Sequence, residues 1–171
     1  MPRALLSFVL LFGVRMASAD GPDPKLAGTY RYVGGEAERT KLTAAIEAVV
    51  SKMNAFARGI ARSRLEKGNA PTAEVKITLG SDAITIARTG KPAISAPDDG
   101  SKVDRNTTAG SQKVSHTVAD GKIVQDMQGK NSHSVNVFSL SGDGVTLTIH
   151  TKISSGSLPG EVVYSMTYEK R

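Results

Sequence analysis

Two hydrophobic periodicities divide the chain. Between residues 36 and 67, apolar residues recur every three or four positions, which is the spacing of one face of an α-helix. From residue 74 onward, apolar and polar residues alternate, as they do in half-buried β-strands. The pattern predicts one helical segment over 36–67, with a strand before it and a series of short strands after it. The helical stripe consists of Leu42, Ile46, Val49 or Val50, Met53, Phe56 and Ile60.

The predicted helical segment is long for a domain of this size. About 32 residues would form a straight rod of roughly 48 Å, which exceeds the face of a small β-domain. We therefore expect a break near Asn54 or Gly59, giving a helix-turn-helix that covers the strands. An unbroken helix would instead favour an α+β fold, with a curled antiparallel sheet around one long helix.

The alternating segments predict β-hairpins. Residues 74–79 and 83–88 flank the turn Gly80-Ser81-Asp82, and residues 112–118 and 122–128 flank a turn at Asp120-Gly121. Three further strands are predicted over 133–140, 145–151 and 161–170. Residues 89–110 give a weaker signal, compatible with one or two short strands or with a mobile loop.

Turns recur every eight to twelve residues, which is the rhythm of an up-and-down β-sheet protein. We expect a mainly β fold, an antiparallel up-and-down barrel of eight to ten strands with the helix-turn-helix as its lid. The inward face of these strands is mostly apolar and supplies the candidate ligand-binding residues; an alternative is that they form a packed core. These residues are Tyr32, Ile77, Ile84, Ile86, His116, Met127, Tyr164, Met166 and Tyr168.

The N-terminal residues have the three regions of a secretory signal peptide. Arg3 provides a positive start, residues 4–14 form a short apolar run, and Ala17-Ser18-Ala19 forms a small-x-small cleavage site. We expect residues 1–19 to be removed and residues 20–171 to form a single domain, exported to a periplasm or secreted. Removal takes away two arginines and lowers the net charge from +6 to +4. The absence of cysteine excludes disulfides, thiolate metal sites and a cysteine nucleophile.

Four stretches carry a family resemblance: AGTYRYVGGE, ITLGSDAITIAR, KVSHTVADGKIVQDMQGKNSHSVNV and VVYSMTYEKR. A strand, a helical pair, and then a meander of hairpins ending in a tyrosine-bearing strand resembles the calycin group. The resemblance is stronger to the intracellular fatty-acid-binding proteins than to the true lipocalins. It spans nearly the whole mature chain and implies a barrel that binds a hydrophobic or amphipathic small molecule or lipid.

The chain departs from this family at two motifs. Gly28-Thr29-Tyr30 stands where lipocalins have Gly-x-Trp, and the chain contains no tryptophan. Met166-Thr167-Tyr168 stands where fatty-acid-binding proteins have an Arg-x-Tyr that holds the ligand carboxylate, so the tyrosine is kept and the arginine is missing. Because an unpaired buried carboxylate is costly, a fatty acid held by that clamp is not the expected ligand.

The second half of the helical segment is basic. Lys52, Arg58, Arg62 and Arg64 have a default role as a solvated face near a helix C-terminus. A second interpretation is transient contact with an anionic membrane during ligand transfer. Nucleic-acid binding is not expected, because the chain has few aromatic residues and no recognition motif.

No pattern of catalytic or metal-binding residues stands out. The three histidines are scattered without acidic companions at ligand spacing, and no serine lies in a nucleophile-elbow motif. The sequence therefore favours a non-catalytic exported binding protein without a cofactor or metal. Two alternatives remain open: a protein-interaction module, such as an inhibitor or an envelope-associated structural protein, with a filled barrel, and a small hydrolase or isomerase with His116, a tyrosine and an acid at the barrel mouth.

Overall fold

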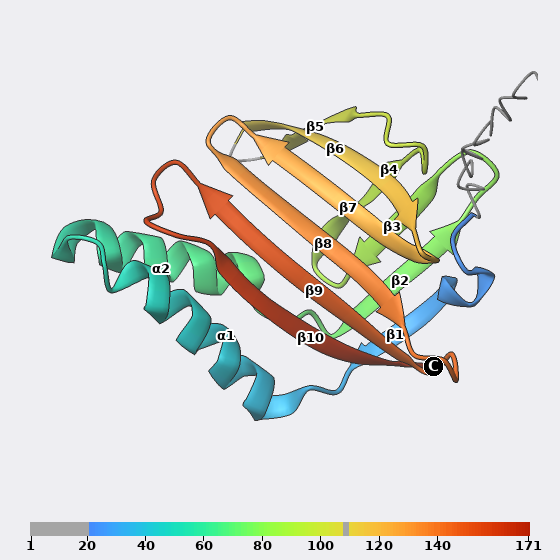
Figure 1. Cartoon of the computed structure of the whole chain (residues 1–171), viewed down its shortest axis with the longest axis horizontal. Helices are drawn as coiled ribbons and strands as arrows, with labels where there is room; N and C mark the ends of the chain where they lie inside the picture. Colours follow the sequence, from blue (N-terminus) through green and yellow to red (C-terminus); the bar gives the residue numbers. More distant parts are fainter. Residues whose placement is uncertain (1–20, 108–109) are drawn as a thin grey trace, which may run out of the picture.

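A computed structural model describes residues 21–107 and 110–171 of the chain. The predicted signal peptide, residues 1–19, lies outside the described residues. One ten-stranded antiparallel sheet and two α-helices make up the fold (Figure 1). The elements are a 3₁₀ turn η1 (Pro24–Leu26), β1 (Gly28–Tyr32), α1 (Gly35–Val50), α2 (Ala55–Asn69), β2 (Glu74–Leu79), β3 (Ile84–Arg88), β4 (Lys91–Ala96), β5 (Val103–Thr107), β6 (Gly110–Ala119), β7 (Lys122–Gly129), β8 (Ser132–Leu140), β9 (Thr146–Ser155) and β10 (Val162–Lys170).

The sheet curls into a nearly closed barrel. Its strand order is β4-β3-β2-β1-β10-β9-β8-β7-β6-β5, and every neighbouring pair is antiparallel. Neighbouring strands are thus consecutive in the chain, apart from the β1–β10 pair that joins the two halves. This confirms the predicted calycin-like up-and-down barrel with a helical lid.

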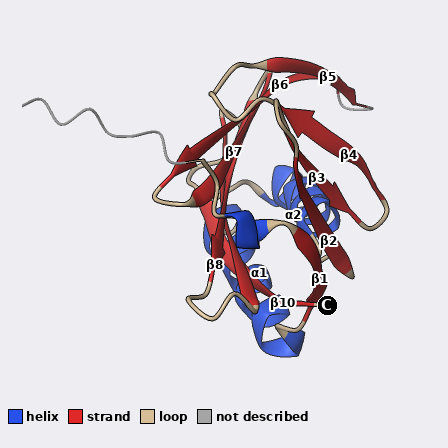
Figure 2. Cartoon of the chain, turned by 90° about the vertical axis from the view of Figure 1, so that its right-hand side faces the viewer, coloured by secondary structure: helices blue, strands red, loops and turns tan. Residues whose placement is uncertain are grey.

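Strands β4 and β5 are the two ends of the sheet and do not pair with each other in the described residues. The segment between them lies against β6 instead. Gly100 N donates to His116 O at 2.9 Å, and Asp99 forms an isolated bridge with Thr117. The seam between the sheet ends is therefore bridged by a connecting segment and not by a strand ladder (Figure 2).

The weakly patterned segment 89–110 contains two strands, so the strand interpretation was right and the loop interpretation wrong. Most side chains of β4 are exposed, and only Ala96 is fully buried. Alternation between apolar and polar residues arises when one face of a strand is buried. Since β4 buries so little, its sequence carries little of that signal.

The helical segment breaks after Val50 and resumes at Ala55. Asn54 is the N-cap of α2, and its side-chain oxygen accepts from Ala57 N at 3.0 Å. The break predicted near Asn54 is confirmed, whereas Gly59 lies inside α2. The alternative of one continuous helix wrapped by a curled sheet is wrong.

Only the first half of the predicted apolar stripe is buried. Leu42, Ile46, Val49 and Val50 on α1 belong to the core. Phe56 and Ile60 on α2 are 82% and 42% exposed, so the prediction that one stripe runs through both helices was wrong. The turn at 51–54 changes the direction of the second helix, so α2 packs against the core through Ala61 and Leu65 instead.

The N-terminal turn packs into the core of the barrel. Leu26 in η1 is fully buried, and the Tyr30 hydroxyl donates to Leu26 O at 2.9 Å. Asp23 N donates to Gly121 O in the β6–β7 turn at 3.4 Å. The short segment before β1 is thereby fastened to the β6–β7 hairpin.

The lid is joined to β10 through a carboxylate. The last β1–β10 pair is Tyr32 with Tyr168. The residue before Tyr168 on β10, Thr167, donates from its backbone N to the Glu38 carboxylate of α1 at 2.9 Å. The Thr167 hydroxyl donates to the same carboxylate at 2.6 Å. Helix α1 therefore lies alongside β10 in Figure 1. Neither helix in the described part of the chain has the length and apolar character needed to span a membrane.

Candidate functional site

A cavity of about 260 Å³ lies inside the barrel beneath the end of α2. Residues 68–72, which end α2 and lead to β2, form one wall, and side chains from β3 to β10 form the rest. Five of the nine candidate ligand-binding residues line it: Ile86, Met127, Tyr164, Met166 and Tyr168. Sequence alternation thus placed on the inward face five of the 21 residues that line the cavity.

The other four candidates lie outside the lining of this cavity. Ile77 and Ile84 are buried in the apolar core. Tyr32 is partly exposed near the start of α1, where its hydroxyl donates to Gly35 O at 3.0 Å and its ring meets the Tyr168 ring edge-on at 5.5 Å between centroids. The fourth, His116, is fully buried.

His116 begins a row of polar side chains that crosses the barrel. His116, Gln125, Asn136, Thr151 and Tyr164 are direct cross-strand partners on β6, β7, β8, β9 and β10. Thr151 Oγ1 donates to Asn136 Oδ1 at 2.8 Å, and Asn136 Nδ2 donates to Gln125 Oε1 at 3.2 Å. Gln125 Nε2 then lies 3.0 Å from His116 Nε2. Because buried polar groups need partners, this row satisfies groups that would otherwise be costly inside an apolar barrel.

The row fixes the protonation of His116. The Gln125 amide accepts through Oε1, so its Nε2 is the donor to His116 Nε2, and the proton of a neutral ring then sits on Nδ1. Nδ1 faces the carbonyl groups of Ala96 and Ile84 without a well-formed hydrogen bond. Burial lowers the pKa of His116, partly offset by these carbonyls. No acid takes part in the row, so the predicted alternative of a His-Tyr-acid catalytic cluster finds no support.

The polar row continues into the lid. The Tyr164 hydroxyl donates to Asn69 Oδ1, at the end of α2, at 3.0 Å, and Asn69 Nδ2 donates to Leu65 O at 2.7 Å. Burial raises the pKa of Tyr164, which keeps the phenol protonated and able to donate. Two hydrogen-bonded series, one from His116 to Thr151 and one from Tyr164 to Leu65, therefore meet at the Thr151–Tyr164 cross-strand pair.

Three cations line the same cavity, and none was singled out from the sequence. They are Arg88 at the end of β3, Lys91 at the start of β4 and Arg105 on β5. Arg88 is half-buried, and its guanidinium carbon lies 5.7 Å from the centroid of the Phe138 ring on β8. Burial lowers the pKa of Arg88, and burial together with the nearby Arg88 and Arg105 charges lowers the pKa of Lys91.

One of these cations carried a readable signal. Arg88 has the same phase as Ile84 and Ile86 on its strand, so alternation places it on the inner face. Arg105 had no comparable signal, because the position of β5 was not clear from the sequence. In the described residues, no group of three or more His, Cys, Asp or Glu side chains is placed to hold a metal ion.

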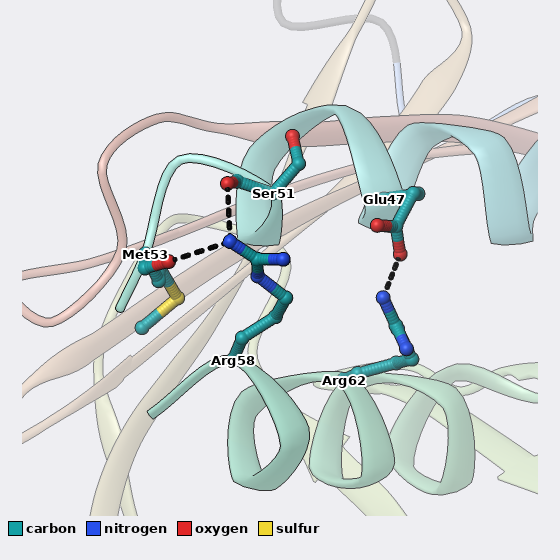
Figure 3. Close-up of polar contacts among 5 residues, drawn as sticks. All are labelled: Glu47, Ser51, Met53, Arg58 and Arg62. Carbon is teal, nitrogen blue, oxygen red and sulfur yellow. Dashed lines mark hydrogen bonds and ion pairs between the residues drawn. The ribbon is translucent and has the colours of Figure 1, made fainter. Parts of the chain in front are cut away.

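The basic residues of the lid have divided roles. Arg58 Nη2 donates to the carbonyl oxygens of Ser51 and Met53 at 2.9 and 3.0 Å, and Arg62 pairs with Glu47 on α1 (Figure 3). These two arginines hold the helical hairpin together, which differs from the expectation of a fully solvated basic face. Lys52 and Arg64 are exposed.

Several solved structures of low sequence identity share the fold. No protein-family model matches the chain, and no curated protein matches it. A fatty acid transporter, REP1-NXSQ, is 19% identical with a TM-score of 0.52, covering 87% of this chain and 98% of that chain. A secretory abundant heat soluble protein from Ramazzottius varieornatus is 13% identical with a TM-score of 0.58, covering 90% and 98%. The zebrafish ileal bile acid-binding protein, solved with cholic acid, is 14% identical with a TM-score of 0.51, covering 86% of this chain and 99% of that chain.

These similarities extend over nearly the full length of the solved chains and establish a calycin-like barrel. At such low identities they show the fold alone. The protein is therefore a calycin-like β-barrel with a helix-turn-helix lid and a cavity beneath it.

Proposed function

We propose that the protein is an exported, non-catalytic carrier that holds a hydrophobic or amphipathic small molecule in its barrel. The observation that carries this proposal is the cavity beneath the lid, where apolar side chains such as Ile86, Ile149 and Met166 lie beside polar groups that are at least as numerous. A concave site that combines apolar side chains with convergent polar groups suits an amphipathic small molecule. The structural neighbours that transport a fatty acid or hold cholic acid support the same class of ligand.

A non-catalytic role fits the chemistry of the cavity wall. His116 is fully buried and bonded to Gln125, and the polar groups facing the cavity are amides, hydroxyls and cations. A general base needs access to its substrate and a pKa near the working pH. The side chains at this cavity support binding and orientation of a molecule.

Export rests on the three-part signal sequence at the N-terminus. Intact mass measurement of the protein from its native host tests it. A species beginning at Asp20 supports export, and a species that retains residues 1–19 would contradict it.

We further propose that α2 delivers cargo at an anionic membrane. Phe56, Ile60, Arg64 and Lys67 recur at spacings of four, four and three, which places them on one face, and all four are exposed. Exposed apolar residues beside cations are the composition of a helix that lies in a membrane interface. Lys52, at the hairpin turn, is also exposed, whereas Arg58 and Arg62 serve the hairpin itself.

Vesicle sedimentation tests the membrane proposal. We expect binding to vesicles containing phosphatidylserine, weaker binding to phosphatidylcholine vesicles, and loss of binding in Phe56→Glu. Val145→Glu is the matched control, because Val145 is also exposed but lies outside the lid, next to β9. Equal losses in the two variants would overturn the role of α2.

Native mass spectrometry tests the carrier proposal itself. The protein is purified from its native envelope and measured intact under gentle conditions, then again after organic extraction. A stoichiometric small molecule that extraction removes is the expected result. A protein that stays empty even with excess lipid would refute the carrier and favour a protein-interaction module.

A further inference from the structure

We propose that the cavity contains an anion site, formed by Arg88, Lys91 and Arg105, that selects amphiphiles with a doubly charged head such as a phosphate monoester. This inference rests on the proposed carrier function and specifies its ligand class. All three side chains line the one cavity that also contains Tyr164 and Tyr168. A ligand there would place its head among the cations and its tail against Ile86, Ile149 and Met166.

These three cations have no acidic partner in the described part of the chain. The ion pairs found there join other residues, and the acids near the sheet ends are engaged elsewhere: Asp104 with Lys113, and Glu74 with Arg171. Lys91 Nζ donates to a backbone carbonyl, Gly68 O, at 2.8 Å. A carbonyl accepts a hydrogen bond but does not neutralise a charge.

Arg88 is aimed into the barrel and held there. Its guanidinium lies over the ring of Phe138, which is fully buried on a strand across the interior. This contact orients the group and leaves its in-plane N–H donors free to meet an anion. Tyr168 faces the same cavity, and burial raises its pKa, so its phenol remains a neutral donor.

The number of cations favours a head with more than one negative charge. Arg88, Lys91 and Arg105 interact unfavourably with one another, as their mutual effect on the pKa of Lys91 and Arg88 shows. A monocarboxylate would neutralise one of three charges. A phosphate monoester carries nearly two charges above its second pKa, near 6, and offers three acceptor oxygens.

This site does not coincide with the final-strand clamp that the family resemblance implies. The position of the clamp arginine is occupied by Met166. The cations here come instead from β3, β4 and β5, on both sides of the seam between the sheet ends.

Calorimetric titration of the purified protein tests the site with three ligands that share one tail. Octyl phosphate, octanoate and octan-1-ol carry two, one and no negative charges at pH 8, and an octyl tail suits a cavity of this size. We expect octyl phosphate to bind at least tenfold more tightly than octan-1-ol, with octanoate between them.

Two variants assign the effect to the cations. In Arg88→Met and in Arg105→Gln we expect the affinity for octyl phosphate to fall at least tenfold, with octan-1-ol changed less than twofold. Lys76→Met is the matched control, because Lys76 is an exposed cation on the outer face of β2. Retained binding of octan-1-ol shows that each variant is folded.

Each contrary result has a distinct meaning. Equal affinity for octyl phosphate and octan-1-ol would overturn the anion site and leave the carrier function standing. Equal affinity for octyl phosphate and octanoate would overturn the preference for two charges. If none of the three ligands binds, and native mass spectrometry finds no other cargo, the carrier function fails and the anion site with it.

Discussion

His116 shows how one buried side chain couples stability to pH. Its pKa in the folded protein is lowered by burial, so the unfolded chain takes up a proton at a higher pH, near 6.5. The free energy of unfolding should therefore fall as the pH drops below about 6.5, by at most about 1.4 kcal/mol per pH unit for this one group. Urea unfolding at pH 7, 6 and 5 measures it.

His116→Gln is the control for that experiment. Glutamine does not titrate, so the variant should lose the His116 part of the slope between pH 7 and 5, even if its stability at pH 7 is lower. Identical slopes in the two proteins would show that His116 does not carry the effect.

Arg88 should lower the stability of the ligand-free protein while it serves the proposed anion site. Arg88 is half-buried and takes part in none of the ion pairs of the described residues, and replacing buried ions by apolar residues of similar size is often stabilising. We expect Arg88→Met to raise the free energy of unfolding of the ligand-free protein by about 1 kcal/mol. Thermal melts alongside Lys76→Met measure this; a less stable Arg88→Met would mean that the cation has a stabilising role in the fold.

At the scale of elements, the lid depends on its turn. Asn54 supplies the only side-chain cap bond described for α2, so Asn54→Ala should destabilise the helix by about 1 kcal/mol. Hydrogen exchange should become faster in α2 and stay unchanged in β8 and β9. Asn54→Asp keeps a capping oxygen and should behave like the parent protein.

The elements differ in how much of them the sequence could predict. Strands with one buried face, such as β2 and β10, were predicted together with their inward residues. On β2, Val75 and Ile77 alternate with polar neighbours. On β10, Met166 and Tyr168 do the same. The helix break was found from length and from Asn54. The direction of α2 could not be predicted, because Phe56 and Ile60 continue the apolar spacing of α1 in the sequence. The turn between the helices rotates these two side chains away from the core.

The cavity wall was harder to predict than the barrel. Alternation tells inside from outside, and it placed Ile86, Met127 and Tyr164 correctly. It does not tell which inward residues pack together, as Ile77 and Ile84 do, and which face a cavity. The cation group was missed because its members lie on three strands, two of which, β4 and β5, had no clear pattern.

For the whole molecule, the seam between β4 and β5 is the least cross-linked part of the barrel. Each of these strands has one ladder partner, whereas β8 and β9 have two. We expect backbone amides of β4 and β5 to exchange faster than those of β8 and β9, because fewer hydrogen bonds must break to open them. Peptide-resolved hydrogen exchange measures this; equal protection would mean that the connecting segment closes the seam as firmly as a ladder.

The positions of the three cations give the seam a further consequence. Arg88 and Lys91 belong to one free end of the sheet and Arg105 to the other. An anion held by all three would be a noncovalent cross-link between the two edges of the sheet, which no strand ladder joins in the described residues. A bound ligand would then connect the two ends of the sheet in the protein that carries it. The ligand-bound barrel would be stiffer at the seam than the empty barrel and little changed elsewhere.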